Sequence, residues 1–288
     1  MSSSPTVLLL GASGPCGQAF IQRMEGRGVS LIAVSRRPPA RTSAHVLWLQ
    51  QDLDLEPVSM EASVLVSAGP LIHALRQVEA GTRLGRVVAL SSASTLFKSD
   101  SRDPEERALM QRLIDQEDAL ALACEQRDIR LTLLKPTLIY GGDSSSNVGR
   151  VSGLAARLPV LPYCGRGLRH PVHASDLAEL MERCLVLGDA AEGRWLLGGG
   201  ETIEYPTMLR RMAASTGSQP RLLRVPLWLM RLALASAHGC GRLRDLKAVM
   251  LMRQGVDLVV DDTPARRQLG WSPRRFLPGV SGQSGNSV

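Results

Sequence analysis

The stretch VLLLGASGPCGQAF, residues 7–20, decides the fold class. A short apolar run meets three evenly spaced glycines, and a helical pattern follows them. Glycine suits such a turn because it adopts unusual dihedral angles and lets a phosphate approach bare backbone amides. A strand, a glycine turn and a helix in this order predict a dinucleotide site rather than a plain structural turn. The expected cofactor contacts in this loop are Gly11, Ser13, Gly14, Pro15, Cys16 and Gly17.

Short apolar runs alternate with longer helical patterns along most of the chain. The expected strands are Thr6–Leu10, Ser30–Val34, Val46–Leu49, Ala62–Val66, Arg86–Leu90, Arg130–Leu134 and Arg194–Leu197. The expected helices lie near Gln18–Glu25, Leu71–Ala80, Pro104–Arg127 and Ser175–Leu187. Apolar strands that alternate with helices predict an α/β fold, a Rossmann-type doubly wound parallel sheet, with a smaller and mainly helical C-terminal lobe.

The domain boundaries follow from where this alternation loosens. We expect a NAD(P)-binding domain over residues 1–140, to which residues 171–200 return. Residues 141–170 and 201–280 form the smaller lobe, and residues 281–288 form a disordered tail. The most membrane-like stretch, residues 225–237, is too short to span a bilayer and contains Arg231. We interpret it as an amphipathic helix packed on the body of the protein. Contact with a membrane surface is the alternative. A cytoplasmic location is expected.

Composition argues against several function classes. The net charge is +7, but neither a dense basic stripe nor interleaved aromatics accompanies it, so nucleic acid is not an expected partner. The five cysteines include no CxxC pair, which argues against a disulfide framework or a zinc site. His170 and His173 have no third ligand nearby, so no metal is expected.

The end of the second expected strand distinguishes between two dinucleotides. Sites for NAD usually place an acidic residue there, on the ribose hydroxyls. This chain reads LIAVSRRPP over residues 31–39, with Ser35, Arg36 and Arg37 at that place and no carboxylate. A guanidinium pairs with a 2′-phosphate, so the sequence favours NADP over NAD as the cofactor. The alternative is a solvated surface turn.

Several motifs, taken in order, resemble the extended, epimerase/dehydratase-like branch of the short-chain dehydrogenase/reductase superfamily. They are GASGPCG, QQDLDL, VVALSSAS, LLKPTLIYG, HPVHASDLAEL and DDTPARRQLGWSPRRF. The resemblance implies that Ser92 matches the catalytic Ser/Thr, that His173 and Asp176 position a helix, and that the long helix pairs in a homodimer. The further cofactor contacts that it implies are Asp52, Leu53, Ser67, Ala68, Gly69, Ser91, Lys135 and Pro136.

The catalytic Tyr and Lys of that family, spaced YxxxK, are missing. The residues four positions after Tyr140, Tyr163 and Tyr205 are Ser144, Gly167 and Leu209. If Glu117 takes the place of the Glu in the family's YxxxKxxxE helix, we expect the Tyr and Lys positions at about Gln111 and Asp115. Neither side chain supplies a phenol beside an ammonium.

Two interpretations remain open. In the first, the chain is an NADP-dependent oxidoreductase or a nucleotide-sugar epimerase/dehydratase-like enzyme, with Ser92, Lys98 and Tyr140 as candidate catalytic residues. In the second, it binds NADP without catalysis, as a sensor or an assembly or regulatory protein. A hydrolase is disfavoured because no G-x-S-x-G elbow is present. Arg166, Arg169 and His170 suit an anionic small-molecule substrate, and equally suit an ordinary basic surface.

Overall fold

A computed structural model of the chain describes residues 5–39, 45–81, 83–142, 153, 158–239 and 248–277. Most of the polar loop expected at 141–150, and the tail expected at 281–288, lie outside these residues. No described helix has both the length and the apolar character needed to cross a membrane.

A seven-stranded sheet forms the centre of the larger domain, and all of its pairings are parallel. Its strands are β1 (Thr6–Leu10), β2 (Ser30–Ser35), β3 (Val46–Gln50), β4 (Val64–Ser67), β5 (Arg86–Leu90), β6 (Arg130–Pro136) and β11 (Gly193–Leu197). Their order is β11-β6-β5-β4-β1-β2-β3. This is the doubly wound arrangement, so the predicted fold class is confirmed. The strand expected at Ala62–Val66 begins at Val64, because Ala62 packs in the core from the preceding loop.

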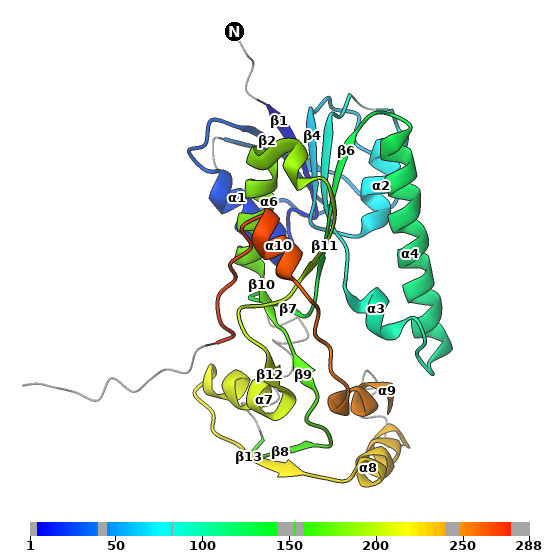
Figure 1. Cartoon of the computed structure of the whole chain (residues 1–288), viewed down its shortest axis with the longest axis vertical. Coiled ribbons are helices and arrows are strands. Elements are labelled where there is room, and N and C mark those ends of the chain that lie inside the picture. Colours follow the sequence, from blue (N-terminus) through cyan, green and yellow to red (C-terminus); the bar gives the residue numbers. More distant parts are fainter. Residues whose placement is uncertain are drawn as a thin grey trace, which may run out of the picture.

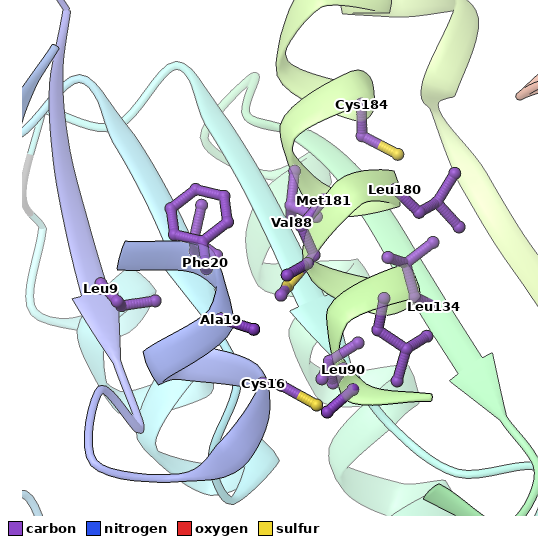
Figure 2. Packing of buried hydrophobic residues seen from close by; sticks show 14 of the residues in the cluster. Leu9, Cys16, Ala19, Phe20, Val88, Leu90, Leu134, Leu180, Met181 and Cys184 are labelled. Carbon is purple, nitrogen blue, oxygen red and sulfur yellow. The ribbon is translucent and has the colours of Figure 1, made fainter. Parts of the chain in front are cut away.

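Helices cover both faces of the sheet (Figure 1). One face carries α1 (Pro15–Met24), α6 (Ala174–Leu187) and α10 (Thr263–Gln268), and the other carries α2 (Leu71–Glu79) and α4 (Pro104–Glu125). Figure 2 shows how Phe20 and Cys16 of α1 and Met181 of α6 meet aliphatic side chains of the sheet in the core between the sheet and these two helices. Since apolar layers on both sides bury the strands, their ends are the places left for a ligand.

The smaller lobe lies at the carboxyl edge of the sheet (Figure 1). Its helices are α7 (Tyr205–Ala214), α8 (Leu227–Gly239) and α9 (Ala248–Met252), with the 3₁₀ turn η2 (Arg253–Gly255). Short strands add three two-stranded pairs to the helices expected there: β7 (Ile139–Tyr140) with β10 (Val172–His173), β9 (Leu168–Arg169) with β12 (Ile203–Glu204), and β8 (Val160–Tyr163) with β13 (Arg221–Arg224).

Two short elements complete the connections. They are α3 (Ser94–Lys98), which follows β5, and the 3₁₀ turn η1 (Gly188–Ala191), which precedes β11. After the smaller lobe the chain returns to the larger domain, where Ala265, Leu269 and Trp271 pack in the same core as α1 and α6. The sequence places this segment in the smaller lobe, whereas its buried side chains belong to the larger domain.

Candidate active site

The glycine loop lies where the chain changes direction across the sheet. β1 is paired with β2 on one side and β4 on the other, so the loops that leave β1 and β4 diverge around a crevice. Gly11 has a φ of +73°, and a Cβ there would lie 2.4 Å from the Gly69 amide nitrogen. A Cβ on Gly17 would lie 2.3 Å from the Gly11 carbonyl oxygen. Only glycine therefore fits at these two positions of the loop.

The first turn of α1 is open to an anion. Gly14 is the N-cap residue, no side chain caps the helix, and no acidic residue stands in its first turn. The free amides and the positive end of the helix dipole therefore face the crevice. Pro15 begins the helix without needing an amide partner. Cys16 belongs to the core instead, where it is only 3 % exposed, and this burial raises the pKa of its thiol to about 12.

A pocket of about 500 Å³ joins the glycine loop to the end of β2. Ser13, Ser35, Arg36 and Arg37 line it. The Ser35 hydroxyl accepts a hydrogen bond from the Arg37 amide at 3.1 Å, which fixes the turn that presents the two arginines. The structure therefore brings together four residues that the sequence assigned to cofactor binding from two separate segments.

The loops after β3 and β4 form the rest of this edge. Asp52 accepts a hydrogen bond from the Asp54 amide at 3.1 Å, and Leu53 packs against the core between the sheet and the helices α2 and α4. Ser67 is fully buried at the end of β4, and its hydroxyl has no partner within the described residues. The Ala68 amide donates to the Leu10 carbonyl at 2.9 Å, which holds the loop through Gly69 against the glycine loop. A buried hydroxyl without a partner is uncommon and marks a place where a ligand can supply one.

A buried charged network lies at the ends of β5 and β6. The Lys135 ammonium donates to Glu117 Oε2 at 2.6 Å, and the Ser91 hydroxyl donates to Glu117 Oε1. The side chains of Glu117 and Lys135 are only 2 % and 11 % exposed. Pro136 follows at the end of β6, and its carbonyl accepts from the Ala93 amide. Ser91 is the half-buried end of the network, so it is the member that a ligand reaches first.

The comparisons with known proteins agree with this geometry. No protein-family model matches the chain. A UDP-glucose 4-epimerase from Vibrio cholerae is 25 % identical over 246 residues, which cover 81 % of this chain and 70 % of that protein. MoeE5 in complex with UDP-glucose and NAD has a TM-score of 0.68 at 18 % identity over 94 % of both chains. The epimerase Mth375 from Methanothermobacter thermautotrophicus has a TM-score of 0.71 at 16 % identity over 96 % and 90 %. The chain therefore shares the fold of these two solved structures and is similar in sequence to the Vibrio cholerae epimerase.

The helix that the family resemblance predicts to carry the catalytic pair is α4. Gln111 and Asp115 are exposed and bond each other at 2.8 Å, so neither faces the crevice. The expected positions also need correction: counting eight and four residues back from Glu117 gives Leu109 and Leu113. Leucine exchanges no proton, so the family's Tyr and Lys have no chemical equivalent at either pair of positions.

The three catalytic candidates named from the sequence lie in different surroundings. Ser92 follows β5 and accepts from the Ser94 amide at 3.1 Å. Lys98 lies 3.7 Å from Glu106, and burial, followed by the Arg253 charge, lowers the pKa of its ammonium. Ser92 is therefore the candidate nearest to the buried network, in sequence and in strand position.

The placement of Tyr140 favours packing over proton transfer. It makes edge-to-face contacts with His173 and Phe276, at centroid distances of 4.9 and 4.7 Å. Its hydroxyl donates to the Arg275 carbonyl, and burial raises its pKa. A phenol that is harder to ionise is a poorer base near neutral pH. His173 caps α6 by accepting from the Ser175 amide at 3.1 Å, as expected for a positioning residue.

The basic residues expected to meet an anionic substrate are mostly occupied. Arg166 pairs with Glu204 at 2.7 Å, and Arg169 donates to the Val256 and Arg253 carbonyls. Burial lowers the pKa of His170. Within the described residues, no three metal-ligating side chains gather in one place. Arg169 therefore joins β9 to η2 and Val256, and Arg166 joins its loop to β12. The ring Nδ1 of His170 is buried and has no hydrogen-bond partner among the described residues.

Proposed function

We propose that the chain binds NADP(H) across the glycine loop and acts on a nucleotide-linked sugar by hydride transfer. The pocket lined by Ser13, Ser35, Arg36 and Arg37 is the observation that carries the cofactor part. The Vibrio cholerae relative is a UDP-glucose 4-epimerase, and MoeE5 was solved with UDP-glucose and NAD. These relatives support a nicotinamide cofactor and a nucleotide-sugar substrate.

The residues present fit a dinucleotide. The close approach of Gly11 to Gly69 leaves no side chain in the path of a pyrophosphate, and the uncapped α1 offers it free amides. The preference for NADP(H) rests on charge, because two guanidinium groups and a hydroxyl stand where a carboxylate would repel a 2′-phosphate. Arginine also matches phosphate geometry with paired hydrogen bonds.

The buried network is the chain's own candidate for proton handling. A bound nicotinamide supplies a hydride acceptor and donor. As the Ser91 hydroxyl gives its proton to a sugar carbonyl oxygen, the Lys135 ammonium can pass a proton through the Glu117 carboxylate to Ser91, which leaves Lys135 as a neutral amine. The reverse sequence removes a proton from a sugar hydroxyl. Ser92, one residue further along, can orient the sugar oxygen, as the family resemblance implies.

The cofactor preference can be tested by titrating the purified chain with NADPH and NADH under identical conditions. We expect tighter binding of NADPH, and we expect Arg36→Glu to abolish the difference. Arg112→Glu on the exposed surface of α4 changes the net charge by the same amount and should leave the preference intact. Equal or tighter binding of NADH by the unaltered chain would show that the two arginines do not select a cofactor with a 2′-phosphate.

The chemistry can be tested with a panel of nucleotide sugars, each followed for interconversion and for change in the nicotinamide absorbance. We expect turnover with at least one sugar, and we expect Ser91→Ala to abolish it while NADPH still binds. If turnover persists in Ser91→Ala and is lost in Ser92→Ala, the proton transfer is assigned to Ser92 instead. NADPH binding with no turnover on any sugar would favour the non-catalytic interpretation.

A further inference from the structure

The tip of the smaller lobe exposes a group of large apolar side chains. We call it the α8 surface; its members are Leu223, Trp228, Leu229, Leu232 and Met250, which come from β13, α8 and α9. Trp228 is 68 % exposed and Leu232 is 58 % exposed. The three elements that carry these side chains are adjacent, because β13 leads directly into α8 and α8 contacts α9. Large apolar side chains exposed together on adjacent elements can mark an interaction site.

The described part of α8 has little contact with the protein body. Among its side chains from Leu227 to Ser236, only Leu234 is buried. Trp228 and Leu232 are four residues apart and therefore lie on the same side of the helix. Figure 1 places α8 at the end of the lobe farthest from the sheet. The exposed side is therefore remote from the cofactor crevice and is not part of it.

The charged residues of the segment 221–239, which carries most of the α8 surface, are all arginines. Arg221, Arg224 and Arg231 are exposed, and the sequence from residue 221 to residue 239 contains no Asp or Glu. Within the described residues, none of these three arginines pairs with a carboxylate. The described part of the α8 surface therefore combines exposed Trp and Leu side chains with arginines that have no carboxylate partner among the described residues.

We infer that the α8 surface docks on an anionic phospholipid membrane. Tryptophan suits the boundary between headgroups and acyl chains, and arginine reaches phosphate while its stem stays in apolar surroundings. A second copy of the chain is a poorer occupant, because a two-fold contact through this surface would bring the same arginines together. Since no described helix can cross a bilayer, α8 lies on the membrane surface rather than through it.

The test uses the full chain and two kinds of vesicle, phosphatidylcholine alone and phosphatidylcholine mixed with phosphatidylglycerol. We expect co-sedimentation with the anionic vesicles, about a hundredfold stronger than with the neutral ones because three arginines act together. Trp228 fluorescence should shift to the blue on binding, and high salt should weaken the binding. Equal binding to both vesicles would overturn the inference.

Matched variants distinguish binding through the α8 surface from non-specific adsorption to vesicles. Trp228→Ser and Leu232→Ser should each weaken vesicle binding at least about tenfold. Leu122→Ser removes an equally exposed leucine, 54 % exposed on α4, and should leave binding unchanged. Circular dichroism checks that each variant is folded. Absence of vesicle binding would overturn the inference, and so would concentration-dependent dimerisation that Trp228→Ser abolishes. Neither result depends on the cofactor or on turnover, so the proposed function is unaffected.

Discussion

Replacing Glu117 by Gln tests whether the charged network on α4 is as buried as its geometry indicates. Glu117 and Lys135 meet at 2.6 Å with side chains 2 % and 11 % exposed. The variant leaves an ammonium buried without its counter-charge, which costs about 3–5 kcal/mol of unfolding free energy. For a chain of this size, each 1 kcal/mol lowers Tm by roughly 2–4 °C, so we expect a fall of about 6–20 °C.

The neighbouring residue supplies a matched control. Asp118 pairs with Arg194 at 2.7 Å, but these side chains are 62 % and 46 % exposed. Because water screens this pair, Asp118→Asn should cost only about 0.2–1 kcal/mol. The distance between the charged atoms is nearly the same in the two pairs, whereas the exposure of the side chains differs. The comparison therefore reports mainly the effect of burial on the loss of stability.

The assay is urea unfolding of four chains in a double-mutant cycle. The variants are Glu117→Gln, Lys135→Met and the two combined. The glutamine amide oxygen introduced by the first change can still accept from Ser91, and the methionine introduced by the second needs no counter-charge. We expect the double variant to be about 1–3 kcal/mol more stable than the sum of the single losses predicts. Strict additivity, or a Glu117→Gln loss no larger than that of Asp118→Asn, would refute the reasoning.

Three further predictions concern other parts of the molecule. Gly17→Ala should lower stability by about 1–3 kcal/mol in urea unfolding, since its Cβ meets backbone, whereas Gly14→Ala, whose Cβ lies 3.4 Å from the nearest atom, should be tolerated. Burial lowers the pKa of His173, so as the pH falls the imidazole of the unfolded chain takes up a proton before that of the folded chain. The free energy of unfolding should therefore fall as the pH drops below about 6.5. His173→Asn keeps an N-cap acceptor and should flatten this slope in a pH series of melting temperatures. Burial raises the pKa of Cys16 and Cys184 to about 12, so a thiol reagent at about pH 8 should modify them only at the rate of unfolding.

The fold was predictable from the sequence because its signals are local. Apolar strands, a glycine turn and helical periodicity each act within a few residues, and β1, β5 and α2 begin where predicted. The pairs of short strands in the smaller lobe were not predictable in this way. β7 and β10 contain two residues each, too few for an alternating pattern, and they exist because distant segments meet.

The meeting of Ser13 with Ser35, Arg36 and Arg37 in one pocket could be predicted from the sequence, because the strand ends of a parallel sheet meet at one edge. The contact of Ser91 and Lys135 with Glu117 was not predicted from the sequence. Ser91 and Lys135 were assigned to the cofactor, and Glu117 was used only to align a helix. A signal was present. Met110, Leu113, Leu120 and Cys124 share a helical stripe with Glu117, and an acidic residue in an apolar stripe requires a buried partner.

The loss of the family's Tyr and Lys need not remove cofactor binding, because the two properties rest on different parts of the chain. The crevice proposed for the dinucleotide depends on the backbone, namely the approach of Gly11 to Gly69 and the uncapped start of α1. The catalytic pair depends on two side chains of α4, and leucine at 109 and 113 changes no backbone of the crevice. Cofactor affinity therefore cannot report on turnover. The measurement that distinguishes an enzyme from a binding protein is the effect of Ser91→Ala on turnover at unchanged NADPH affinity.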